Sequence, residues 1–127
     1  MPAPFQNMAT NDTNGPIATI AINTALSDAI TLTDNVLCAV EFPGTWTAAS
    51  LSFSVSWDGS TYTPLYIVSS ALAATEYAIT SPAASITIAL DPAIFASVRY
   101  VKLRSGTAAA TVNQAAARSI RLITRPV

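Results

Sequence analysis

LSFSVSWDGSTYTPLYIV, residues 51–68, is the stretch that decides the fold class. In its first half, Leu51, Phe53, Val55 and Trp57 alternate with three serines. Side chains of a β-strand point alternately to the two faces of a sheet, so this spacing predicts a strand with one face in the core. Trp57 continues the apolar face, and we therefore expect it to be a core residue.

The Asp58-Gly59 pair follows this strand directly and precedes a second β-patterned run. Asp-Gly between two such runs predicts a hairpin with a tight turn, because these residues tolerate positive φ. Pro64 cannot donate to a ladder, so the second strand is expected at a sheet edge or after the proline. Tyr62 has no assignment from this pattern and is open to packing, interface or sugar-stacking roles.

The rest of the chain repeats the short alternating pattern, with turn residues between the runs. An Asp91-Pro92 pair indicates one helical turn, and the Ala-rich segment 107–118 is expected to be a long loop. We predict eight or nine short strands in an all-β, antiparallel, jelly-roll-like β-sandwich. The sandwich domain is expected over residues 17–127, after an extended, flexible N-terminal arm over residues 1–16.

The composition is poor in charge for a soluble domain. Only 10% of the 127 residues are charged, against about 25% in an ordinary soluble domain. All seven acids precede residue 99 and all six bases lie at or after it, although the net charge is only −1. Exposed surface with so little charge tends to associate, and we therefore expect much of it to lie against other subunits.

The basic residues of the last third fall on two alternating strands. If these strands were neighbours in one sheet, they would form a basic face from Arg99, Lys102, Arg104, Arg121 and Arg125. Three explanations remain open: pairing with acids of the same domain, contact with an acidic neighbouring subunit, and nucleic-acid binding. The pI near 5.0 places nucleic acid last of the three.

Residues for catalysis are largely missing from the sequence. It contains no histidine, which excludes Ser-His, Cys-His and His-metal arrangements. The single cysteine, Cys38, is expected to be a small buried apolar residue. The scattered carboxylates suit turns and helix caps better than a catalytic pair. We therefore predict no enzyme activity, no cofactor and no metal site.

Aromatic side chains offer the alternative of a carbohydrate-binding module. A flat ring can stack on the face of a sugar, and the candidates for such stacking are Trp46, Tyr62 and Tyr66. Packing in the core or in an interface is the competing explanation for each.

Two blocks of the sequence resemble a group of small structural proteins of tailed phages. The first is W-x-A-A-x-L-x-F-x-V-S-x-D-G, residues 46–59, and the second is L-D-P-x-x-F-x-x-x-R-Y-x-K-x-R-S-G-T, residues 90–107. An Ala/Gln-rich loop and a basic last strand follow, and the resemblance spans residues 36–127. It implies a virion component with a jelly-roll-like sandwich that decorates or cements the capsid, forms the base of a head spike or belongs to the tail or neck.

Together these observations predict a non-enzymatic virion protein on the particle exterior, at the head, made in the host cytoplasm. Its partners would be the major capsid protein or another virion subunit, and copies of itself in a trimer or pentamer; no membrane is expected. The expected assembly contacts are the arm, through Pro4, Phe5 and Met8, and the five basic residues named above.

Overall fold

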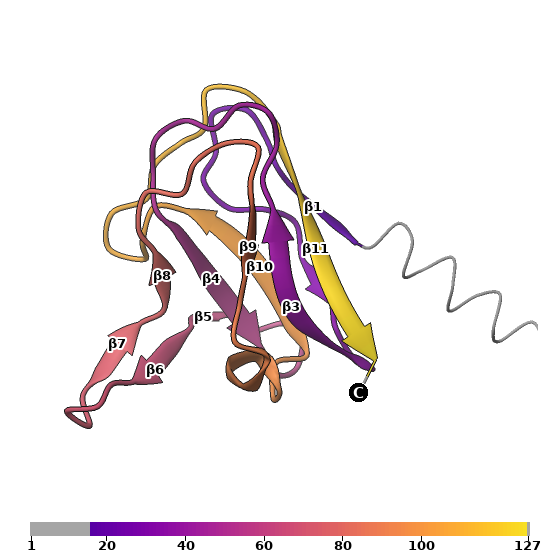
Figure 1. Ribbon diagram of the computed structural model, residues 1–127, viewed down its shortest axis with the longest axis vertical. Helices are drawn as coiled ribbons and strands as arrows, with labels where there is room; N and C mark the ends of the chain where they lie inside the picture. The colour runs from indigo at the N-terminus through magenta and orange to yellow at the C-terminus, as the bar shows by residue number, and fades with distance from the viewer. Residues whose placement is uncertain (1–15, 127) are drawn as a thin grey trace, which may run out of the picture.

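The computed structural model describes residues 16–126, which form eleven short strands and one 3₁₀ turn (Figure 1). The elements are β1 (Ile17–Ile20), β2 (Ile30–Thr31), β3 (Asn35–Glu41), β4 (Leu51–Ser56), β5 (Thr63–Pro64), β6 (Tyr66–Val68), β7 (Ala74–Glu76), β8 (Ala78–Ile79), β9 (Thr87–Ala89), η1 (Pro92–Phe95), β10 (Tyr100–Ser105) and β11 (Arg118–Pro126). Within these residues no helical segment reaches the length and apolar content of a membrane span.

Nine of the eleven strands form two antiparallel sheets, which we call sheets A and B, and β6 and β7 pair only with each other. Sheet A has the order β1-β11-β3-β9, and sheet B has the order β2-β10-β4-β5, with β8 also paired to β4. If β5 and β8 are taken as one interrupted edge strand, successive strands are distributed between the sheets as in a jelly roll. The antiparallel, jelly-roll-like β-sandwich predicted from the sequence is confirmed.

The hydrophobic core lies between the inner faces of the two sheets. Val101 and Leu103 of β10, and Ile120 and Leu122 of β11, alternate with polar residues and are fully buried. The core therefore follows the period-two pattern of the sequence. Each large apolar side chain buried in this way stabilises the fold by roughly 1.5–3 kcal/mol relative to exposure.

The serines of β4 face outward, yet they are buried. Tyr100, Lys102 and Arg104 stand directly opposite Ser56, Ser54 and Ser52 in the register of β10 and β4. Directly opposite residues lie on the same face of an antiparallel pair, so the small hydroxyl side chains lie among these longer ones. Ser52 also donates a hydrogen bond to the Gly106 carbonyl oxygen at 2.7 Å.

The prediction that Trp57 belongs to the core is wrong. β4 ends at Ser56, and Trp57 begins the loop to β5 with 67% of its surface exposed. The predicted hairpin is present, since β4 and β5 are antiparallel neighbours. Its connection is the longer loop 57–62 rather than a tight two-residue turn, and β5 with Pro64 lies at the sheet edge as expected.

Three aromatic rings close the core between β4 and η1. The rings of Phe53 and Phe95 meet edge to face at 5.2 Å, and Tyr77 lies 5.7 Å from Phe53 and 6.0 Å from Phe95. The 3₁₀ turn that carries Phe95 begins as the sequence predicts, because Asp91 accepts a hydrogen bond from the Ala93 amide and Pro92 occupies the first turn. The turn is thereby fixed against β4.

Cys38 differs in part from its expected buried position. It is the extra residue on β3 where the register with β11 shifts, and its side chain is only partly buried. A β-bulge turns the side chain of the extra residue out of the regular alternation. The Cys38 thiol lies 3.5 Å from the Val36 carbonyl oxygen.

Gln114 joins three loops, residues 21–29, 42–50 and 106–117, through contacts with Thr24 and Thr47. These loops lie at the upper end of the sandwich in Figure 1. Its fully buried side chain accepts hydrogen bonds from the Thr47 amide and from Arg118, and donates to the Thr47 carbonyl and the Ser105 hydroxyl. Its backbone amide donates to the Thr24 carbonyl at 2.9 Å. The expected loop is present, up to Arg118 at the start of β11, and Gln114 is one of the residues that hold it.

We expect Gln114→Leu to lower the free energy of unfolding by about 2 kcal/mol, since it leaves buried or part-buried polar partners without hydrogen bonds. Urea denaturation followed by circular dichroism measures the loss. The neighbouring Asn113→Ala is the control, because Asn113 is exposed. Equal stability of the two variants would contradict the structural role given to Gln114.

Candidate functional site

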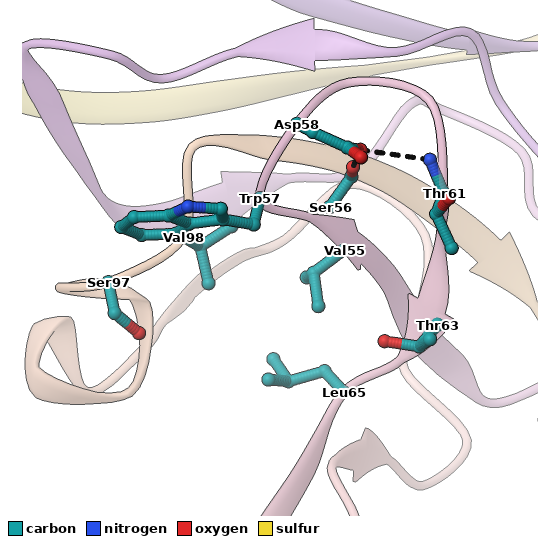
Figure 2. Close-up of a pocket in the computed structure, with 9 residues that line it drawn as sticks. All are labelled: Val55, Ser56, Trp57, Asp58, Thr61, Thr63, Leu65, Ser97 and Val98. Carbon is teal, nitrogen blue, oxygen red and sulfur yellow. Dashed lines mark hydrogen bonds between the residues drawn. The ribbon is translucent and has the colours of Figure 1, made fainter.

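A hollow of about 390 Å³ opens beside Trp57, at the end of the sandwich opposite to Gln114. Its apolar part consists of Trp57, Val55, Leu65 and Val98. Its polar part consists of Ser56, Asp58, Thr61, Thr63 and Ser97. Figure 2 shows the indole along one wall, with Val55 and Leu65 across the space from it. A hollow with an aromatic wall and several hydroxyl groups suits a small amphipathic ligand.

The loop that carries Trp57 is organised by Asp58. One carboxylate oxygen, Oδ1, accepts hydrogen bonds from the amides of Ser60 and Thr61 at 2.8 and 3.0 Å and from the Ser56 hydroxyl at 3.0 Å. Gly59 has a φ of 82°, which an L-residue rarely adopts, and its amide donates to the Ser56 hydroxyl oxygen. These bonds fix the conformation of the loop.

The same hydrogen bonds affect the ionisation of Asp58. The backbone amides of Thr61 and Ser60, followed by the Ser56 hydroxyl, lower the pKa of its carboxyl group below 3.8. Hydrogen bonds to the charged form favour that form. Asp58 is therefore an anion and a hydrogen-bond acceptor at neutral pH.

Trp57 is held from one side by a cation. The Arg99 guanidinium carbon lies 5.1 Å from the centroid of the indole ring, which is a cation–π distance. Arg99 directly follows Val98, so one short segment supplies both a wall of the hollow and a contact that orients the ring. Most of the indole is nevertheless exposed to solvent.

The three aromatic residues proposed from the sequence do not meet at one site. Trp46 lies before β4 and the loop 57–62 lies after it, so the two are at opposite ends of that strand. Trp46 is half-buried, packs edge to face on Phe42 at 5.0 Å and donates its indole N–H to the Ala49 carbonyl. These contacts give Trp46 a packing role.

The two tyrosines differ from each other in their surroundings. Lys102 places its ammonium 4.3 Å from the centroid of the Tyr62 ring, and Tyr62 is half-buried. Tyr66 is 52% exposed on β6. Trp57 was not among the candidates, because its place in the alternation of β4 predicted a core residue. The signal against a core position is the Asp58-Gly59 turn that follows immediately.

The five basic residues do not form a single basic face. Arg99, Lys102 and Arg104 lie on or next to β10 in sheet B, whereas Arg121 and Arg125 lie on β11 in sheet A. The strands are therefore not sheet neighbours, which corrects that part of the sequence interpretation. Outward residues of the two sheets point away from each other across the sandwich.

Pairing with acids of the same domain is observed for two of these residues. Arg104 lies 3.5 Å from a carboxylate oxygen of Glu76, with both side chains largely buried, and Arg121 lies 3.2 Å from a carboxylate oxygen of Glu41. The second pair is half exposed, so it stabilises the fold weakly. Contacts of the basic residues with a neighbouring subunit stay a prediction.

Pro4, Phe5 and Met8, the expected contacts of the arm, lie outside the described residues.

A second surface feature is the hairpin of β6 and β7, residues 66–76, which we call the projecting hairpin (Figure 1). Its strands pair with each other and with no other strand of the described chain. Val68 and Leu72 are 67% and 85% exposed, and Tyr66 is exposed beside them. At its base, Glu76 accepts hydrogen bonds from the Ala108 amide and pairs with Arg104, which anchors the hairpin to sheet B.

Within residues 16–126, no group of three or more His, Cys, Asp and Glu side chains is placed to hold a metal ion. Comparison with protein-family models, with curated proteins and with solved structures finds no match to this chain.

We expect the contribution of the ionised Asp58 to stability to be present above pH 3.8, because its pKa in the folded protein lies below that value. This contribution is lost as the pH falls through the folded-state pKa. Asp58→Asn keeps an acceptor oxygen and removes the charge. Urea denaturation between pH 2 and pH 7 should show the wild type more stable than the variant at neutral pH, with the difference shrinking in acid. A difference independent of pH would contradict this explanation.

Proposed function

We propose that this protein is a non-enzymatic structural subunit of a tailed phage or phage-like particle, located on the head exterior. It forms a homo-oligomer and docks on the major capsid protein as a decoration, cement or spike-base subunit. The proposal rests on the resemblance of residues 36–127 to small tailed-phage structural proteins, and the jelly-roll sandwich and the charge-poor surface are consistent with it.

The observation that carries the assembly role is the projecting hairpin. Single exposed apolar residues are ordinary, but this element gathers Tyr66, Val68 and Leu72 on a two-stranded ribbon. An isolated two-stranded hairpin is only marginally stable in water. Contact with a neighbouring subunit would cover its apolar residues and stabilise it.

The conformation of Leu72 supports the same role. Its φ is 62°, in the left-handed region where a non-glycine residue costs roughly 1–2 kcal/mol. A glycine or asparagine would be more favourable there, and it would also avoid the exposed apolar surface. A leucine at such a tip is favourable when a partner buries its side chain.

We expect Val68→Ser combined with Leu72→Ser to convert the oligomer into monomers while the sandwich stays folded, because both side chains are exposed and outside the core. Native mass spectrometry gives the oligomeric state, and circular dichroism gives the fold. Ile22→Ser is the matched control, since Ile22 is 56% exposed at the other end of the molecule. A wild-type monomer, or an unchanged oligomer in the double variant, would argue against the proposal.

The docking role of the arm is tested separately. Deletion of residues 1–12 is expected to abolish attachment to purified particles that lack this protein, while the sandwich stays folded. Co-sedimentation with the particles measures attachment, and the full chain is the reference. Attachment of the shortened chain at the wild-type level would show that the arm is not the docking element.

A further inference from the structure

The hollow beside Trp57 has features that packing within this chain does not explain. Trp57 leaves the core at the end of β4, and its 67% exposed ring is the largest apolar side chain on this end of the molecule. Exposed tryptophan is unfavourable in water because the indole is mostly apolar. Yet the ring is oriented by Arg99 and belongs to a loop that hydrogen bonds of Asp58 and Gly59 fix.

The chemistry around the ring defines the kind of ligand. One wall is a flat indole and the floor is aliphatic, from Val55, Leu65 and Val98. Thr61, Thr63 and Ser97, which carry hydroxyl groups, also line the hollow, together with Asp58, whose carboxylate lies next to Ser56 and Thr61 (Figure 2). A ligand that fits has one flat apolar face and an edge of hydrogen-bond donors and acceptors, which is the description of a pyranose ring.

The volume of the hollow and the charge of Asp58 narrow the class of ligand further. A volume of about 390 Å³ lies at the lower end of small-molecule sites and accommodates one or two sugar rings. The hydrogen bonds from Ser56, Ser60 and Thr61 to Asp58 end on Oδ1. A carboxylate has a second oxygen, Oδ2, that can accept from a sugar hydroxyl. A carboxylate in this position repels an anionic ligand and accepts strongly from a neutral hydroxyl.

We propose that the hollow beside Trp57 is a binding site for one or two neutral sugar rings of a surface glycan, with the indole as stacking platform and Asp58 as hydroxyl acceptor. Hydrogen bonds of Asp58 and Gly59 hold the loop that carries Trp57, so little loop ordering opposes binding. Val68 and Leu72 of the projecting hairpin do not line the hollow, and the proposal does not depend on assembly into a particle.

The test is isothermal titration of the full chain with glucose, galactose, mannose and N-acetylglucosamine, with a disaccharide of each, and with glucuronic acid. We expect saturable binding of at least one neutral sugar and weaker binding of glucuronic acid. Trp57→Ala should weaken that binding at least tenfold and Asp58→Asn severalfold. The Val68→Ser, Leu72→Ser double variant should bind as the wild type does.

Two results would overturn the proposal. One is the absence of saturable binding by every neutral sugar in the panel, and the other is undiminished binding by Trp57→Ala. If Trp57→Ala instead dissociates the oligomer while no sugar binds the wild type, the hollow accepts a side chain of a second copy, and the sugar site is refuted. Because Trp57 lies outside the core, loss of the fold does not confound its variant.

Discussion

The contact between Phe53, Phe95 and Tyr77 is the constraint on which the hollow beside Trp57 and the projecting hairpin depend. Phe53 is fully buried at the centre of β4, and Phe95 carries the 3₁₀ turn against it. The turn leads into Ser97, Val98 and Arg99, which supply one side of the hollow and the cation beside Trp57. Tyr77 fixes the other side, because it follows the projecting hairpin and its amide donates to the Leu65 carbonyl.

The two ends of the sandwich differ in how they are closed. At one end, Gln114 satisfies the polar groups of three loops, and Gly106 lets the chain turn with a φ of 92° where a Cβ would collide with the Ala110 carbonyl oxygen. A buried and fully bonded network of this kind rigidifies the loops that it joins. At the other end, aromatic packing supports an open hollow and a projecting hairpin. The surface available for binding is therefore concentrated at the second end.

The strand pattern was predictable from the sequence because the alternation of apolar residues has the same period as a strand. Val101, Leu103, Ile120 and Leu122 occupy the inward positions that the sequence predicts, and the Asp91-Pro92 pair begins a helical turn as expected. Local rules decide these features, since they depend on neighbouring residues and on capping.

Features that depend on pairing between distant segments were not predictable. Which strands are neighbours decides whether Arg99 and Arg121 share a face, and the jelly-roll order places them in different sheets. The end of β4 is set by where β10 stops pairing, so Trp57 leaves the core although its position in the alternation is inward. The projecting hairpin likewise interrupts one edge strand, whose two parts, β5 and β8, both pair with β4. No local pattern in the sequence indicates this insertion.

The most direct test of this account is the accessibility of Trp57, because the exposed indole separates a binding hollow from a core residue. The chain has two tryptophans, so Trp46→Phe and Trp57→Phe each leave one emitter. Acrylamide quenching should be strong for Trp57, with red-shifted emission, and clearly weaker for the half-buried Trp46. If Trp57 were the better shielded of the two, it would belong to the core, and the binding hollow proposed for this end of the sandwich would not exist.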